Sequence, residues 1–316
     1  MTFTFRPAIR DASPLLIGLV GPSGCGKTRS ALELATGIRE LRGGKIVGLD
    51  TEAGRMKHYA PKNGEKADPA RGTYDFLHAS FGAPFSSDRY TEALTECARE
   101  AAGGVVIIDS QSHEHEGQGG YLEYHEAELD RMAGDDWKKR ERMTFTGWIK
   151  PAAARRRLIN TLLQIDCAFV FCFRAKEKLR IVRGQEPIQT GWQAIAGDEF
   201  VYEMTVRCLL PPGAMGVPDW SEDAFKYGVA KREDAHVPIL PNGERLSVKT
   251  GRALAEWVSG APVVTLDQVC AAISTMTDEA SQGAAKALAS RLTGEDVKLA
   301  RKAWVARLEE LKGEPI

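Results

Sequence analysis

Several features of secreted and membrane proteins are missing from this chain of 316 residues. No apolar run reaches about 18 residues, the length at which a segment becomes a candidate membrane span. Residues 1–14 have no apolar core after their basic residues, so they do not resemble a signal peptide. The six cysteines include no C-x-x-C pair, which argues against a zinc site or a disulfide framework. We therefore expect a cytoplasmic protein that does not bind membranes.

Strong positive charge over the whole chain is also missing, because the formal net charge is −1. This excludes a globally basic nucleic-acid-binding protein. The charge is unevenly distributed, however. Residues 111–136 contain eight acidic residues and one arginine, whereas residues 137–183 contain thirteen lysines and arginines and three acidic residues. This asymmetry indicates either a polyanion-binding face or a solvated helix face beside a basic loop.

The most informative motif is the stretch Gly21-Pro22-Ser23-Gly24-Cys25-Gly26-Lys27-Thr28. It fits the P-loop pattern G-x-x-x-x-G-K-[ST], and it lies between an apolar run at 15–20 and a helical pattern at 29–41. Glycines allow the tight turn that points backbone N–H groups at phosphate oxygens, and the helix adds the positive end of its dipole. Lys27 can reach the β- and γ-phosphates, and Thr28 can hold Mg²⁺. The motif predicts a nucleoside triphosphate site.

Two carboxylates follow at the ends of apolar strands. Residues 45–50 form a short apolar strand that leads into Asp50-Thr51-Glu52, and residues 105–109 form another that ends in Asp109. The second strand has the Walker B pattern, whose carboxylate can hold the Mg²⁺ shell. A carboxylate at Glu52 can lie near the γ-phosphate and polarise water.

The alternation of strand and helix patterns predicts an α/β doubly wound fold with a mainly parallel sheet. Further strands are expected at 74–80, 168–173, 201–210 and 225–230, and further helices at 151–163 and after Ser87 as N-cap. The basic stretch 174–183 and the segment 184–197 are expected to be loops. Beyond a linker at 259–262, Ala, Leu, Glu and Lys dominate, and three threonines are expected as helix N-caps: Thr265, Thr277 and Thr293. We expect one domain at 1–260 and a helical subdomain at 261–316.

The carboxylate motifs resemble those of one family. The RecA recombinase family has an Asp-x-Glu at the end of the strand after the P-loop helix, and its Walker B strand often ends in Asp-Ser, as Asp109-Ser110 does here. Other stretches are similar to the RecA-like ATPases of bacteriophages, which include phage nucleotide-binding and single-strand annealing recombination proteins. These stretches are Asp109-Ser-Gln-Ser-His113, Gly117-x-Gly-Gly120, Trp148-Ile-Lys-Pro151, Phe173-Arg-Ala-Lys176 and Val229-Ala-Lys231-Arg232. The resemblance covers about residues 12–258 and implies a RecA-like P-loop ATPase core.

The resemblance also implies roles for residues of the nucleotide site, with ATP and Mg²⁺ as cofactors. Lys27 and Thr28 match the P-loop lysine and a Mg²⁺ ligand, and Asp109 matches the Walker B carboxylate. Glu52 matches the catalytic glutamate. Arg174 stands where RecA has a glutamine that senses the γ-phosphate, which leaves two roles open for it: contact with the γ-phosphate or contact with the DNA backbone.

Two further groups of cations take their expected roles from the same resemblance. Lys231 and Arg232 stand where RecA filaments supply cations across the subunit interface, so they would act as arginine fingers in a neighbour's site. Four cations fall where the second DNA-binding loop would lie: Lys176, Lys178, Arg180 and Arg183. Phosphate contacts need accessible cations, and single-strand binding usually adds aromatic stacking, for which Trp192 is the nearest downstream residue.

The expected function is that of an ATP-hydrolysing protein that binds single-stranded DNA and promotes annealing or recombination of phage DNA in the bacterial host. The expected partners are single-stranded DNA, further copies of the chain in a ring or filament, and a phage or host recombination protein. Two alternatives remain open: a small-molecule or nucleotide kinase with 174–183 as its lid, and a non-hydrolysing, nucleotide-gated DNA-binding scaffold. Two minor motifs are a metal cluster or polar segment at His113-Glu-His-Glu116 and a subunit-joining F-x-x-A hook at Phe5.

Overall fold

The computed structural model describes residues 14–180, 188–260, 264–290, 292 and 295–313. Its centre is a sheet of seven strands in which the parallel strands follow the order β3-β2-β4-β5-β1-β7, while β6 pairs antiparallel with β5. The strands are β1 (Leu16–Gly21), β2 (Ile46–Asp50), β3 (Leu77–Ser80), β4 (Val105–Asp109), β5 (Ala168–Arg180), β6 (Ile188–Ala194) and β7 (Val206–Leu209). The expected α/β architecture with a mainly parallel sheet is thus confirmed.

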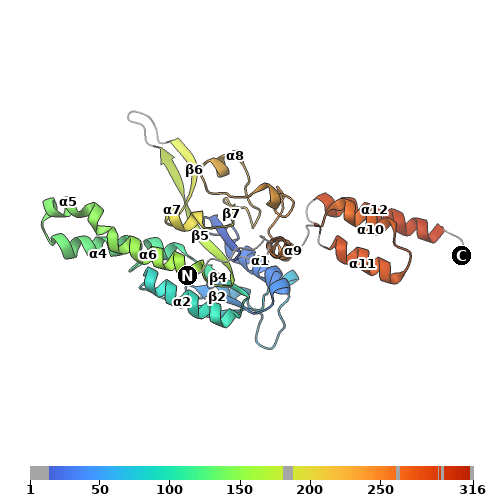
Figure 1. Ribbon diagram of the computed structural model, residues 1–316, viewed down its shortest axis with the longest axis horizontal. Helices are drawn as coiled ribbons and strands as arrows, with labels where there is room; N and C mark the ends of the chain where they lie inside the picture. Colours follow the sequence, from blue (N-terminus) through green and yellow to red (C-terminus); the bar gives the residue numbers. More distant parts are fainter. Residues whose placement is uncertain (1–13, 181–187, 261–263, 291, 293–294, 314–316) are drawn as a thin grey trace, which may run out of the picture.

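Helices cover both faces of this sheet (Figure 1). On one face α1 packs against α9, and on the other α2 packs against α6. The α-helices are α1 (Lys27–Arg42), α2 (Ser87–Ala101), α3 (Ser112–Glu116), α4 (Tyr121–Ala133), α5 (Trp137–Gly147), α6 (Ile149–Leu162), α7 (Asp198–Tyr202), α8 (Glu222–Lys226), α9 (Val248–Val258), α10 (Leu266–Ser274), α11 (Glu279–Ala289) and α12 (Glu295–Gly313). Short 3₁₀ helices are η1 (Arg55–Tyr59), η2 (Pro69–Arg71) and η3 (Asp234–His236).

The strand register brings the motif residues to one edge of the sheet. Gly21 at the end of β1 lies beside Arg174 of β5, and Asp109 of β4 lies between Cys172 of β5 and Asp50 of β2. Because β5 runs between β1 and β4, a residue of β5 is placed between the P-loop and the carboxylates. Ligand sites of open α/β sheets lie at this carboxyl edge.

The basic stretch after Phe173 is not a loop. β5 continues through it to Arg180 and forms an antiparallel hairpin with β6, so the expected loops at 174–183 and 184–197 are wrong over most of their described length. The inner part of β5, Ala168–Phe173, is fully buried, whereas Lys176 and Glu177 are exposed. The run of apolar residues ends where β5 leaves the buried part of the sheet and enters solvent, although its backbone pairing continues.

Two expected strands in the second half of the sheet are also corrected. Residues 225–230 lie in α8 and the turn after it, where Ser221 accepts a hydrogen bond from Ala224 N and acidic residues occupy the first helical turn. Residues 201–210 contain the end of α7 before the short strand β7. The aromatic and apolar residues of 225–230 are typical of a strand, but the N-cap hydrogen bond of Ser221 favours a helix there.

Helix N-caps lie close to the expected positions. Thr265 caps α10 as expected, whereas α2 is capped by Ser86 rather than Ser87, and α11 by Asp278 rather than Thr277. Thr293 and Phe5 lie outside the described residues. The helices α10 to α12 share an apolar cluster of their own that includes Val269, Ile273 and Leu292, and they lie at the right of Figure 1.

The acidic segment 111–136 forms α3 and α4, and the basic segment that follows forms α5, α6 and β5. α4 and α5 pack against each other and extend from the sheet at the left of Figure 1. Arg140 of α5 forms ion pairs with Glu126 and Asp130 of α4, so part of the charge asymmetry is neutralised within this helical pair. No helix in the described part of the chain is long and apolar enough to cross a membrane.

Candidate active site

The P-loop connects β1 to α1 at the carboxyl edge of the sheet. Gly24 and Gly26 have φ values of 79° and 99°, a conformation that favours glycine, and Gly26 is the N-cap of α1. Lys27 Nζ donates hydrogen bonds to the carbonyl oxygens of Gly21 at 2.8 Å and Pro22 at 2.7 Å. Cys25 of the loop is fully buried. An incoming phosphate can replace the two carbonyls as the acceptor for Lys27.

Thr28 and Asp109 form a pair of oxygen ligands next to the P-loop. Thr28 Oγ1 donates to Asp109 Oδ2 at 2.5 Å, and Asp109 is only 5 % exposed. Burial raises the pKa of Asp109, and the charge of Glu52 adds to this, while the hydrogen bond from Thr28 opposes it. A divalent cation would favour the ionised carboxylate. Hard oxygen ligands of this kind fit Mg²⁺, which commonly takes one or two protein ligands and completes its shell with water and phosphate.

A metal centre made of protein side chains alone is not present in the described part of the chain, since no three His, Cys, Asp or Glu residues gather there in a suitable arrangement. The His113–Glu116 segment forms α3, and Glu114 within it is buried and paired with Arg155. This contradicts the metal-cluster interpretation of that segment. Mg²⁺ would instead depend on Thr28, Asp109 and the nucleotide itself.

Asp50 organises the turn that carries Glu52. Its Oδ1 accepts a hydrogen bond from Glu52 N at 2.7 Å, and its Oδ2 accepts one from Met56 N at 3.1 Å and lies 3.0 Å from His78 Nε2. Asp50 is 2 % exposed, so its carboxylate serves the backbone of the turn rather than a ligand. The first acid of the Asp-x-Glu motif therefore positions the second.

Glu52 is held by two arginines. Arg174 donates to Glu52 Oε1 through Nε at 3.0 Å and through a terminal nitrogen at 2.7 Å, and Arg55 donates to Oε2 at 3.0 Å. Burial by itself would raise the pKa of Glu52, but the hydrogen bonds and charge of Arg174, with the charges of Arg55 and His113, hold that pKa below its ordinary value. The carboxylate is therefore ionised near neutral pH, and both of its oxygens are engaged.

The cleft that these residues line has a volume of about 650 Å³, within the range of pockets that hold small molecules and cofactors. Glu52, Asp109, Arg174 and the P-loop residues 22–24 and 26–28 line it, whereas Gly21 and the buried Cys25, which were also expected at the nucleotide, do not. Several other residues line the cleft without having been expected from the sequence: Arg55, His58, Tyr59, Met215 and Arg245. Arg55 stands three residues after Glu52, where a helical turn favours pairing, whereas Arg245 has no local sequence signal and reaches the cleft only through the fold.

Hydrogen bonds connect the ends of β2, β4 and β5 behind the cleft. Thr51 Oγ1 accepts from Ser110 N at 2.7 Å and shares a hydrogen bond of 2.6 Å with His113 Nδ1. Ser112 Oγ accepts from Arg174 N at 2.8 Å. Burial, followed by the charge of Arg174, lowers the pKa of His113, so its ring is neutral near pH 7. These bonds join the segment after the Walker B strand to the strand that carries Arg174.

None of the other predicted site residues whose side chains the structure describes, Lys176, Lys231 and Arg232, lines the cleft. Lys231 Nζ donates to Met204 O at 2.8 Å, while Arg232 donates to Leu240 O at 2.5 Å and lies over the ring of Trp220. Neither lines this chain's own cleft, and a role in a neighbour's site stays a prediction. Lys176 is exposed on β5, and the backbones of Lys178 and Arg180 continue the same strand. Arg183 lies outside the described residues.

Comparison with known proteins finds no family model and no curated sequence that matches this chain, so the RecA-like assignment remains a resemblance based on its motifs.

Proposed function

We propose that this chain binds Mg²⁺-ATP and hydrolyses it, and that the nucleotide controls its binding to single-stranded DNA. The observation that carries the proposal is the convergence of Lys27, the Thr28–Asp109 pair, Glu52 and Arg174 on one cleft. Each supplies a function that phosphoryl transfer to water requires: charge neutralisation, metal binding, orientation of water and sensing of the γ-phosphate.

The contact between Arg174 and Glu52 sets the order of the proposed steps. In the described state Arg174 occupies Glu52 Oε1, where a water-activating carboxylate must accept a hydrogen bond. The γ-phosphate is a stronger attractor for a guanidinium because it carries more charge and more acceptor oxygens. Transfer of Arg174 from Glu52 to the γ-phosphate would free the carboxylate only when a triphosphate is bound.

The strand β5 connects the nucleotide site to the expected DNA-binding segment. Arg174 lies on β5 just before the β5–β6 hairpin, which carries the basic residues of the expected DNA-binding segment. A change in the position of Arg174 would act on the base of this hairpin. The DNA substrate, the phage context, the annealing activity and a ring or filament of copies follow from the motif resemblance, and they are part of the proposal.

The test is release of inorganic phosphate from ATP, with and without a single-stranded oligonucleotide. We expect measurable turnover in the wild type, stimulation by the strand, and loss of turnover by a factor of about 10² or more in Glu52→Gln, with ATP binding retained. Lys27→Ala should lose ATP binding as well. Turnover that survives Glu52→Gln would refute the water-activating role, and phosphate transfer only to an added acceptor would favour a kinase.

The ion pairs on Glu52 specifically favour one alternative, the non-hydrolysing scaffold. If ATP does not displace Arg174, Glu52 stays engaged and the protein binds ATP without turning it over. DNA affinity that depends on ATP, combined with no phosphate release from the wild type, would support that alternative.

A further inference from the structure

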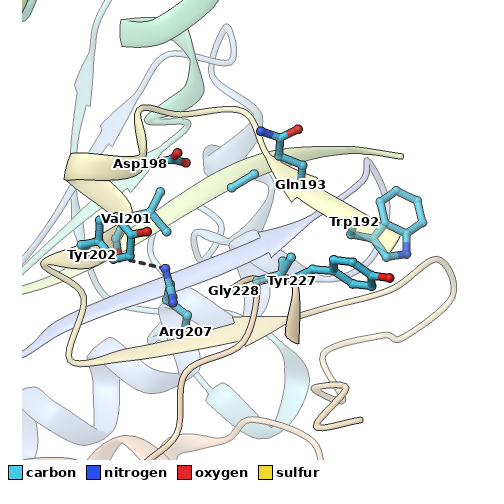
Figure 2. Close-up of a pocket in the computed structure, with 10 residues that line it drawn as sticks. Trp192, Gln193, Asp198, Val201, Tyr202, Arg207, Tyr227 and Gly228 are labelled. Carbon is cyan, nitrogen blue, oxygen red and sulfur yellow. Dashed lines mark hydrogen bonds between the residues drawn. The ribbon is translucent and has the colours of Figure 1, made fainter. Parts of the chain in front are cut away.

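A second, smaller pocket lies at the base of the β5–β6 hairpin, beside the edge strand β7 (Figure 2). Its volume is about 180 Å³, and its walls come from β6, α7, β7 and the turn after α8. The lining residues that matter here are Trp192, Asp198, Val201, Tyr202, Arg207 and Tyr227. None of them lines the cleft at the P-loop.

Arg207 is a buried cation that forms no ion pair with the residues that the structure describes, although Asp198 lines the same pocket. The Arg207 side chain donates one hydrogen bond, to Val201 O at 3.2 Å, and the residue is 7 % exposed. Its Nε has no hydrogen-bond partner, and within the described ranges no carboxylate lies within ion-pair distance of it. Burial lowers the pKa of Arg207, and the charges of Tyr202 and Asp198 oppose this and compensate part of the cost of burial. Buried arginines are normally paired, because an unpaired buried charge costs several kcal/mol.

A second cation lies opposite Arg207. Arg207 and Lys231 exchange both backbone hydrogen bonds as an antiparallel pair, which places their side chains on the same face of the sheet. Like charges directly opposite each other are destabilising in such a pair. Lys231 Nζ is partly compensated by Met204 O, whereas among the described residues Arg207 has only Val201 O as an acceptor. An anion bound in the pocket would compensate the positive charge of Arg207.

Aromatic rings form another part of the wall. In the view of Figure 2, Trp192 and Tyr227 lie at the right and Arg207 lies at the left beneath Val201. The ring of Tyr227 packs against Gly191 of β6, where a Cβ atom would come within 2.8 Å of it, and Gly191 has a φ of 121°. The backbone at this point thus leaves room for a ring beside the strand. Trp192 is half-buried, so part of its surface remains accessible.

The volume limits what the pocket can take. Pockets for whole small-molecule ligands usually occupy about 300–1,000 Å³, so this one encloses a small ion or one group of a larger ligand, such as a phosphate, while the rest of that ligand lies outside against its rim. A buried guanidinium selects an oxyanion, and exposed aromatic surface selects a flat ring. A nucleotide carries both groups, because its phosphate is an oxyanion and its base is a flat ring.

We propose that this pocket binds one nucleotide unit, with its phosphate on Arg207 and its base against Trp192 and Tyr227. Two sources supply this chemistry: a single nucleic-acid strand and a free nucleoside monophosphate. We take the nucleic-acid strand as the ligand, and this choice rests on the proposed function. Occupation of the pocket would fix β6 against β7, so a strand bound here would also hold the hairpin that continues from Arg174.

The test compares variants of the full-length protein by fluorescence anisotropy, with an ATP analogue that is not hydrolysed filling the cleft at Lys27. The probes are an oligothymidylate of about 20 nucleotides, longer than the site size of one single-strand-binding fold, and an abasic strand of equal length. Thymidine monophosphate and inorganic phosphate serve as competitors and are also titrated alone by calorimetry. The variants are Arg207→Met, Arg207→Lys and Trp192→Ala. Matched controls are Arg301→Met on α12 and Trp137→Ala on α5, both exposed in the structure.

We expect Trp192→Ala to weaken binding of the oligothymidylate about tenfold, the loss of one base–aromatic stack, and to leave the abasic strand unaffected. Arg207→Met should weaken both strands and reduce the slope of log affinity against log salt by about 0.7. Its melting temperature should be unchanged or higher, because a buried unpaired charge is replaced by an apolar chain of similar length. Arg207→Lys should retain part of the affinity.

The outcomes separate this pocket from the proposed function. If the wild type binds no strand but binds thymidine monophosphate through Arg207, the free nucleotide is the ligand and the DNA-binding proposal fails. If the strand binds in an ATP-dependent manner but the three pocket variants behave like their controls, the pocket proposal is overturned and the proposed function stands. A lowered melting temperature in Arg207→Met together with unchanged binding would also overturn it, because Arg207 would then be structural.

Discussion

The ion pair between Glu52 and Arg174 joins the ends of β2 and β5 across the position of β4. Glu52 is mostly buried, and its side chain is 15 % exposed, whereas that of Arg174 is 41 % exposed. The arginine therefore has room to move while the carboxylate stays in place. This difference in exposure is the physical basis for treating Arg174 as the part that responds to nucleotide.

Arg174→Met should move the acidic limb of the pH–rate profile for ATP hydrolysis to higher pH. Arg174 lowers the pKa of Glu52, so its removal lets burial raise that pKa, and the carboxylate is protonated, and inactive as a base, at a higher pH. The measurement is kcat/KM between about pH 4 and 7, because kcat/KM reports the pKa values of the nucleotide-free protein, in which Arg174 contacts Glu52. Arg55→Met, which removes a weaker influence, should shift the limb less. Equal shifts in both variants would contradict the dominant role of Arg174.

His115 should make the protein less stable in mild acid. Burial and the charge of Arg155 lower its pKa from 6.5 to about 4, so the unfolded chain binds a proton at a higher pH than the folded protein does. The free energy of unfolding should therefore fall as pH falls from 6.5 through about 4. In His115→Gln, whose amide oxygen can still accept from Arg155, the melting temperature should fall less over this range. Identical pH dependence in both proteins would show that the ring is not the cause.

At the scale of elements, a buried ion pair fixes the helix that follows the Walker B strand. Arg155 of α6 donates to Glu114 of α3 through two nitrogens, at 3.1 and 2.9 Å, and Ser87 of α2 donates to the same carboxylate. The side chains of Arg155 and Glu114 are 1 % and 3 % exposed. Three helices are thus joined at one carboxylate, close to the segment that contacts Thr51 and Arg174.

Breaking this pair should destabilise the protein strongly. Arg155→Met leaves Glu114 buried without its counter-ion, which costs about 3–5 kcal/mol of unfolding free energy. Arg157→Met on the same helix provides the control, because its pair with Asp88 is exposed and contributes less than about 1 kcal/mol. Denaturant unfolding of both variants measures the difference. A cost for Arg155→Met no larger than the control's would show that solvent or another group compensates Glu114.

At the scale of the whole molecule, the apolar residues divide between the sheet and the C-terminal helices. The two clusters on the faces of the sheet include residues up to Val258, and the cluster of α10 to α12 begins at Val264. The P-loop cleft draws its lining from residues before 250. The helices after the linker therefore contribute nothing to the described candidate active site.

A chain that ends at residue 260 should fold and keep ATP turnover close to that of the full chain. Its melting temperature should lie within a few degrees of that of the full protein, since no described core cluster of the sheet loses a member. Calorimetry and phosphate release test this, and sizing in each nucleotide state shows whether assembly needs α10 to α12. Loss of turnover in a folded truncated protein would place these helices in the function of the core.

Local sequence patterns predict the parts of this protein that depend on neighbouring residues. The P-loop at 21–28 can be read from its glycines and Lys27 because phosphate cradling needs a fixed local spacing. The buried strand at 105–109 and Glu52 at the end of β2 are likewise marked by local patterns. The roles assigned to Lys231 and Arg232 in a neighbour's site, and the function in recombination, remain predictions.

The contacts between charged side chains depend on the three-dimensional fold. The order of the strands places β5 between β1 and β4, and this brings Arg174 to Glu52, 122 residues away in the chain. The hairpin after Phe173 depends on pairing with β6, and the unpaired charge of Arg207 depends on β7, α7 and the turn after α8 enclosing it. Burial and ion pairing are properties of groups brought together from distant segments, so no local pattern records them.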